Sequence, residues 1–345
     1  MRRILVAGLL ALALVAVAAA FERPWQSGSG PPPAIFVRQR SSAVGAPARI
    51  AVPHEEQHGL GDIAPAFVNV VPTAVQRPGS EGCGSAFIYG DFVETLSVQG
   101  EDRSYRLHIP YLYNPLDPAP LVLSFHGSGQ SALAQETYSR LDTISDREGF
   151  VLVTPEGNGN PRGWDIPGIY HDDGFDDVNF TVLLVAKTKL ALCIDPDRVF
   201  ATGMSNGAEM AALAGCRQPD IFAAVAPVAG VIFDGCESPG LPIIAFHGTA
   251  DENIPFEYAP EAVAEWARAD GCVSGPNREQ VTEHVAAVAY ADCDGRDVIL
   301  YVIEGGGHTW PGAEDDAGGA GPTTHEIDAN ELIWAFFVAH PRLLR

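Results

Sequence analysis

The feature that most constrains the fold is an alternation of apolar runs with segments of helical spacing, which begins after Cys83. Near-continuous apolar runs are typical of strands buried on both faces of a parallel sheet. They occupy 120–126, 150–155, 198–204, 222–230, 242–248 and 297–305. Segments with helical spacing occupy 131–149, 175–193, 206–216, 260–270 and 325–340. Residues 92–99 and 103–110 flank Gly100 and predict an antiparallel hairpin. The chain is therefore expected to be α/β, with a doubly wound, mostly parallel sheet and helices on both faces.

The first 82 residues have a different character. Residues 1–20 place Arg2 and Arg3 before an apolar run that ends in alanines, the pattern of a cleaved secretory signal peptide. A retained membrane anchor is the alternative, but no basic stop-transfer patch follows the run. Residues 21–82 are rich in Pro, Gly, Ser and Ala and predict a flexible N-terminal segment. We expect a secreted protein with one folded domain over 83–345.

The net charge limits the partners. Its formal value is −23, and it becomes −25 once Arg2 and Arg3 leave with the signal peptide. Such a surface repels phosphate backbones and anionic lipid. We therefore expect no nucleic acid and, after signal cleavage, no membrane as a partner.

Six cysteines remain in the expected mature chain, an even number that suggests disulfides in an exported protein. Their spacing favours a bond between Cys272 and Cys293. The other four can pair in several ways, and Cys216, inside an apolar segment, is a candidate for a buried free thiol.

The segment Gly203-Met204-Ser205-Asn206-Gly207 has the pattern G-x-S-x-G. It directly follows an apolar run and directly precedes a helical segment, which is the strand–turn–helix setting of a nucleophile elbow. Such a turn projects Ser205 clear of the sheet, at the N-terminus of a helix. Ser205 is the candidate nucleophile, and the alternative is a serine that only caps the helix.

A serine needs a base, and in this arrangement the order along the chain is Ser, acid, His. Among the downstream histidines, His308 lies in a glycine-flanked loop after the last apolar run, where such folds place catalytic groups. Asp251 follows the run 242–248 directly and is the candidate acid. Glu252 is its rival, and Asp234 comes too early in the chain.

Two backbone N–H groups should face the developing oxyanion. We expect one from Asn206, directly after the nucleophile, and one from Ser128 in the loop after the first parallel strand. His126 is expected to be a packed structural histidine. Trp164 and Trp310 follow strand ends on the same edge, so they are candidates to line the substrate cleft, with simple burial as the alternative.

Three acidic runs, at 172–173, 176–177 and 314–316, lack the alternating ligand pattern of a calcium loop. Solvated or helix N-terminal acids are the preferred interpretation. The constellation requires no metal and no cofactor.

At these residues the chain resembles secreted esterases of the polyhydroxybutyrate depolymerase and feruloyl esterase type, related to carbohydrate esterase family 1. The matching stretches include PLVLSFHGSGQSA, IDPDRVFATGMSNGAEMA, IIAFHGTADENIPF and GGGHTWPG. The resemblance implies an α/β-hydrolase fold over 83–345, a Ser205–Asp251–His308 triad and Trp310 near the acyl site. It also implies hydrolysis of carboxylic esters, either feruloyl or acetyl esters of polysaccharide or hydroxyalkanoate oligomers. A serine peptidase of the same fold and a catalytically inactive secreted binding protein are the alternatives.

Overall fold

The computed structural model describes residues 79–166, 176–233, 236, 240–314 and 320–342. The predicted signal peptide at 1–20 and nearly all of the segment 21–82 lie outside these ranges. Residues 79–82 belong to the packed body, since the N–H of Ser80 donates to the carbonyl of Ile194 at 3.0 Å. No helix within the described ranges is both long and apolar enough to span a membrane.

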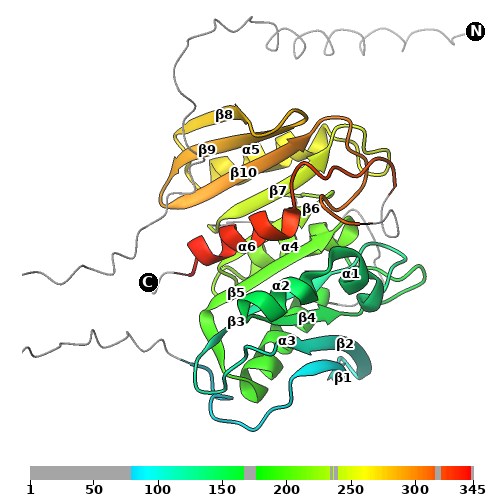
Figure 1. Cartoon of the computed structure of the whole chain (residues 1–345), viewed down its shortest axis with the longest axis vertical. Helices are drawn as coiled ribbons and strands as arrows, with labels where there is room; N and C mark the ends of the chain where they lie inside the picture. The colour runs from blue at the N-terminus through cyan, green and yellow to red at the C-terminus, as the bar shows by residue number, and fades with distance from the viewer. Residues whose placement is uncertain (1–78, 167–175, 234–235, 237–239, 315–319, 343–345) are drawn as a thin grey trace, which may run out of the picture. The chain divides into compact units, whose positions relative to one another are not determined.

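One ten-stranded sheet runs through the described part of the chain, in the order β1-β2-β4-β3-β5-β6-β7-β10-β9-β8 (Figure 1). Parallel pairing joins the six central strands. They are β4 (Val151–Pro155), β3 (Ala119–Phe125), β5 (Ile194–Met204), β6 (Ala224–Val228), β7 (Ile243–Gly248) and β10 (Arg296–Ile303). The expected α/β fold with a mostly parallel sheet is confirmed.

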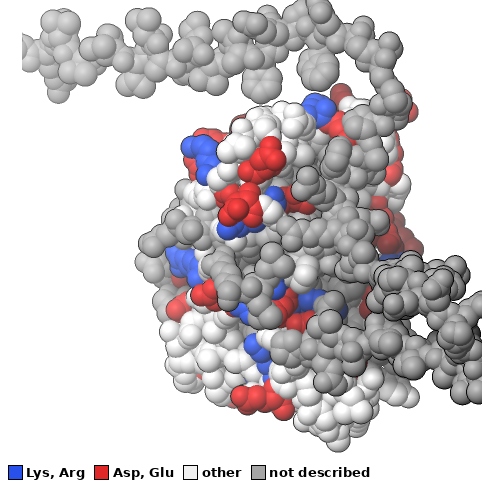
Figure 2. Space-filling model, turned by 90° about the vertical axis from the view of Figure 1, so that its left-hand side faces the viewer, with Lys and Arg blue, Asp and Glu red and all other residues white. Residues whose placement is uncertain are grey.

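The predicted hairpin is also present, as β1 (Gly90–Val98) paired antiparallel with β2 (Glu101–Ile109). The other end of the sheet holds two strands that we did not predict, β8 (Ser274–Gln280) and β9 (Val285–Cys293). Strand β8 is exposed at almost every residue and contains Pro276, so it lacks the apolar pattern that identifies a buried strand. Figure 2 views the molecule from the left-hand side of Figure 1, where acidic and basic side chains are interspersed on the described surface.

Helices cover both faces of the sheet, and each face has its own hydrophobic core. Alternate residues of β3 divide between the two cores, with Leu121 and Leu123 in one and Val122 in the other. The first core also holds buried residues of α3 (Asp177–Ala191), α4 (Asn206–Arg217) and α5 (Tyr258–Ala269). The second holds residues of α1 (Ala132–Ser139), α2 (Leu141–Glu148) and α6 (Ala329–Ala339).

The segment 131–149 was expected to form one helix, and it forms two. Arg140 lies between them with φ 55° and ψ 30°, a left-handed conformation that ends α1 and begins α2. Glycine or asparagine usually occupies this region at a helix end, and arginine rarely does. The sequence around Arg140 therefore gives no signal for the break.

Three disulfides join the described cysteines: Cys83–Cys193, Cys216–Cys236 and Cys272–Cys293. The predicted bond between Cys272 and Cys293 is confirmed. The suggestion of a free thiol at Cys216 was wrong, because the loop after β6 brings Cys236 back to the end of α4.

Candidate active site

The strand–turn–helix around Ser205 has the geometry expected of an elbow. Ser205 lies between β5 and α4 with φ 59° and ψ −129°, a conformation that L-residues rarely adopt. A Cβ on Gly203 would lie 2.3 Å from the carbonyl oxygen of Gly207, and one on Gly207 would lie 2.2 Å from that of Phe125. Both glycines are therefore required for the turn, which leaves Ser205 half-buried at the carboxyl end of a central strand.

Asp251 and His308 come from the ends of two neighbouring strands and form a hydrogen bond. The Nδ1–H of His308 donates to Oδ2 of Asp251 at 2.8 Å, and both side chains are buried. The other oxygen, Oδ1, accepts the N–H groups of Asn253 and Ile254 at 2.9 Å each. Burial alone would raise the pKa of Asp251, but the bonds from His308 and the two N–H groups lower it overall. The carboxylate is thus ionised. It bonds Nδ1 of His308, so the other ring nitrogen, Nε2, is not used in this contact.

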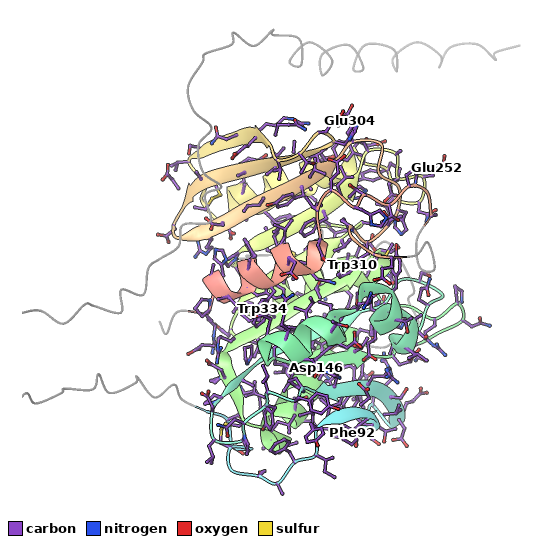
Figure 3. All side chains as sticks on the ribbon, in the orientation of Figure 1. Phe92, Asp146, Glu252, Glu304, Trp310 and Trp334 are labelled. Carbon is purple, nitrogen blue, oxygen red and sulfur yellow. A yellow bond between two sulfur atoms is a disulfide. The ribbon has the colours of Figure 1, made fainter. Side chains whose placement is uncertain are left out.

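Glu252, the rival to Asp251, is exposed and lies at the outer edge of the molecule in Figure 3. The loop that carries Asp251 and the loop that carries His308 contact each other through their backbones. The N–H of Ala250 donates to the carbonyl of Gly306 at 2.8 Å, and a Cβ on Gly248 would lie 2.2 Å from that oxygen. This close approach explains why position 248 is a glycine.

A second histidine also lies against Asp251. His247 is buried at the end of β7, and its Nε2–H donates to the carbonyl of Ile254 at 2.9 Å while lying 3.4 Å from Oδ2 of Asp251. Burial lowers the pKa of His247 and outweighs the opposite influence of Ile254 and Asp251. His247 is therefore neutral and helps to hold the loop that carries Asp251.

Ser205 and His308 line one cavity of about 380 Å³, within the size range of small-molecule sites. Gly127 and Ser128 lie in its wall, from the loop after β3. Asn206 is the first residue of α4, so its N–H has no acceptor within the helix. The sequence prediction missed several other lining residues, because nothing in their local pattern marks them: Gln130, Ala134, Gln135, Tyr138, Met204, Asn253 and Ala320.

Trp164 and Trp310 do not line this cavity, and the expectation that they do is corrected. Both are fully buried. The indole N–H of Trp164 donates to the carbonyl of His126, and that of Trp310 donates to Oδ1 of Asn330. Figure 3 places Trp310 beside the start of α6, inside the fold. Bulky aromatic rings near a strand end are most strongly stabilised by burial, and their single polar atom is satisfied there.

His126 is the packed residue that we expected. It is fully buried, its Nδ1–H donates to the carbonyl of Gly127, and its Nε2 accepts the N–H of Gly157, each at 2.8 Å. Burial lowers its pKa, so the neutral tautomer with hydrogen on Nδ1 is the stable form.

The acidic pair at 176–177 lies at the start of α3. Asp176 accepts the N–H of Asn179 as the helix cap, and Asp177 is buried and pairs with Arg103 at 2.9 Å. Asp177 is thus a helix N-terminal acid but not a solvated one. The pair at 172–173 and residues 315–316 lie outside the described residues. Within the described ranges no group of three or more His, Cys, Asp or Glu residues could hold a metal ion.

A mostly parallel sheet with a serine at a tight strand–helix turn, followed by an acid and a histidine from later strand ends, defines an α/β-hydrolase. Solved structures agree with this fold. The chain is similar to an acetyl xylan esterase from Aspergillus awamori, with a TM-score of 0.57 at 17% identity over 72% of this chain and 99% of that one. Esterase 2 of Thermogutta terrifontis has a TM-score of 0.51 at 18% identity over 72% and 94%.

Sequence comparison is more specific. The family model described as esterase PHB depolymerase matches residues 103–241. The inferred esterase NocK of Nocardia uniformis subsp. tsuyamanensis is 32% identical over 256 residues, which are 62% of this chain and 72% of NocK. Feruloyl esterase D of Neurospora crassa is 25% identical over 79% of this chain and 94% of its own length. The chain belongs to the polyhydroxybutyrate depolymerase and feruloyl esterase family, and it is a carboxylic ester hydrolase.

Proposed function

We propose that the chain hydrolyses esters through an acyl-enzyme, with Ser205 as nucleophile, His308 as general base and Asp251 as the acid that orients the imidazole. The single observation that carries this proposal is the hydrogen bond between Asp251 and His308 beside a cavity that His308 shares with Ser205. An ionised Asp251 selects the tautomer with hydrogen on Nδ1, so Nε2 is free to accept a proton.

In the first half of the reaction, Oγ of Ser205 attacks the ester carbonyl carbon while its proton passes to Nε2 of His308. The tetrahedral intermediate then expels the alcohol oxygen, which takes that proton from His308. In the second half, water loses a proton to Nε2 and attacks the acyl-enzyme. Ser205 recovers its proton as the carboxylic acid leaves.

The negative oxygen of each tetrahedral intermediate needs hydrogen-bond donors that are already in place. We assign this role to the backbone N–H groups of Asn206 and Ser128. The positive end of the α4 dipole adds to the stabilisation, since Asn206 begins that helix.

A fluorophosphonate probe tests the chemistry directly. The wild-type protein should be labelled on one peptide that contains Ser205, whereas the Ser205→Ala variant should remain unlabelled. Labelling of the alanine variant, or none of the wild type, would reject the assignment. The second result would favour an inactive binding protein.

For the substrate, we propose feruloyl or acetyl esters of plant polysaccharide, with hydroxyalkanoate oligomers as the alternative. The names of the relatives support the first choice, among them feruloyl esterase B of Piromyces equi, which is 32% identical over 55% of this chain. The chain spans only 39% of that protein. Hydrolysis rates on methyl ferulate, acetylated xylan, hydroxybutyrate oligomers and a peptide anilide would rank these options and separate an esterase from a peptidase.

We also propose that the protein is exported with residues 1–20 removed, and that a Pro- and Gly-rich segment precedes the esterase domain. The expected start of that domain at Cys83 is corrected, since residues 79–82 already pack on it. Three disulfides support an oxidising compartment. N-terminal sequencing of the protein recovered from the medium tests the proposal, since a mature chain that begins near Phe21 is expected.

A further inference from the structure

The two proposed oxyanion donors belong to different elements. The N–H of Asn206 lies at the start of α4, and that of Ser128 lies in the loop after β3. This inference rests on the proposed function: we infer that residues 156–165, the segment after β4, fix the positions of these two elements relative to each other. Trp164 is the positioning residue that links them.

The backbone of Trp164 forms two hydrogen bonds with the side chain of Asn206. Its N–H donates to Oδ1 of Asn206 at 2.8 Å, and its carbonyl accepts Nδ2 at 3.3 Å. The same Nδ2 lies 3.5 Å from Oε2 of Glu209, one turn further along α4. Asn206 is buried, so these bonds form away from water and orient the residue whose own N–H faces the oxyanion.

The side chain of Trp164 contacts the other element, the loop after β3. Its indole N–H donates to the carbonyl of His126 at 2.8 Å, two residues before Ser128. Its ring packs edge-on against Phe125, with ring centroids 5.1 Å apart. The N–H of Gly129 donates to the carbonyl of Arg162 at 2.6 Å, so the segment holds the Ser128 loop on both sides of the serine.

The segment is itself anchored to the scaffold. The N–H of Asp165 donates to Oδ2 of Asp177 at 2.8 Å, and Asp177 forms its buried ion pair with Arg103 of β2. Arg103 also donates to the carbonyl of Glu156 at 3.1 Å, where the segment leaves β4. Both ends of the segment are therefore held by the Arg103–Asp177 pair. Trp164 directly precedes Asp165, the residue bonded to Asp177.

This arrangement makes a specific demand on Trp164. An oxyanion donor is effective only when it is fixed in place before charge develops, and a displacement of about 1 Å can reduce turnover about 100-fold. Removing the indole N–H should let the Ser128 loop shift relative to Asn206, while both backbone donors remain in the chain. The loss should therefore fall on the tetrahedral intermediate and not on substrate binding.

Trp164→Phe is the test, and Trp266→Phe is its matched control. Trp266 is equally buried, and its indole N–H donates to the backbone carbonyl of Ile232 at 2.9 Å, but it lies on α5 and is not among the residues that line the cavity. Each change removes one indole N–H bond to a backbone carbonyl and replaces a buried indole with a smaller phenyl ring, so the effects on thermal unfolding should be similar. With p-nitrophenyl acetate, Trp164→Phe should lower kcat by about 10- to 100-fold with KM within about twofold. Trp266→Phe should leave both constants unchanged.

A trifluoromethyl ketone inhibitor supplies a second measurement, because it forms a charged tetrahedral adduct with a nucleophilic serine. Its Ki should rise in Trp164→Phe by about the same factor by which kcat falls. If Trp164→Phe does not fold, Asn206→Ala decides the question, since it removes the side-chain ties and keeps the backbone donor. Wild-type kcat and Ki in the folded variant would overturn the inference. Failure of the wild type to react with a fluorophosphonate would instead reject the proposed function.

Discussion

Replacing Glu209 by glutamine is expected to change how the stability of the folded domain depends on pH. Glu209 lies in the first turn of α4, and only 4% of its surface is exposed. Burial raises its pKa to about 7, and the hydrogen bond from Asn206 opposes this only in part. In the unfolded chain the same carboxyl should have an ordinary value near 4.5.

The sign of the effect follows from proton binding. Between the unfolded and the folded pKa, the folded protein holds a proton on Glu209 that the unfolded chain has lost. Stability therefore falls as the pH rises from about 4.5 to about 7, and the full loss is present above that range. The difference between the two pKa values corresponds to roughly 3 kcal/mol at pH 8 relative to pH 4. Glutamine has no such proton to lose.

Urea unfolding of the wild type and Glu209→Gln at pH 5 and pH 8 measures this. The variant should gain stability relative to the wild type as the pH rises, by about 1 M in the urea midpoint at pH 8 for a slope of about 3 kcal/mol/M. Other titrating groups cancel in the comparison, and Glu252→Gln at an exposed position is the control. An equal pH dependence in the wild type and Glu209→Gln would refute the reasoning. Asp270 offers an independent instance, because burial raises its pKa to about 7 against the influence of Arg296.

Three further outcomes are expected. Ser205→Ala should lower ester turnover by about 10⁴-fold or more without changing thermal unfolding, and wild-type turnover would contradict the nucleophile assignment. Asp251→Asn should lower kcat by several orders of magnitude while Glu252→Gln leaves it nearly unchanged, and the reverse ranking would transfer the role to Glu252. Replacing both Cys272 and Cys293 by alanine opens a bond with a sequence separation of 21 and should cost about 3 kcal/mol, or about 10 °C in Tm. An unchanged Tm, or either cysteine found free in unreduced peptide maps, would count against that bond.

The local order of elements was readable because each carries its own signal. Strand β3 is buried at every residue, and its continuous apolar run predicts this before any partner is known. The elbow at Ser205 was readable for a similar reason, because its two glycines satisfy a steric demand within five residues of chain. The edge strand β8 could not be predicted, because it is exposed and contains a proline. Such a strand is defined by its pairing with a neighbour and not by an apolar pattern.

The sequence by itself determined the α/β class, the elbow and the candidates Asp251 and His308, because these depend on burial pattern and on the order of motifs. Only the tertiary structure decided that Asp251 and not Glu252 reaches His308, since adjacent residues leave a strand in different directions. It also decided that Trp164 is buried and bonded to Asn206 and His126 and does not line the cavity. The positioning role that we infer for Trp164 rests on these two bonds, whose partners lie 42 and 38 residues away in the chain. Contacts between residues so far apart follow from how the sheet brings strand ends together, and no local pattern records them.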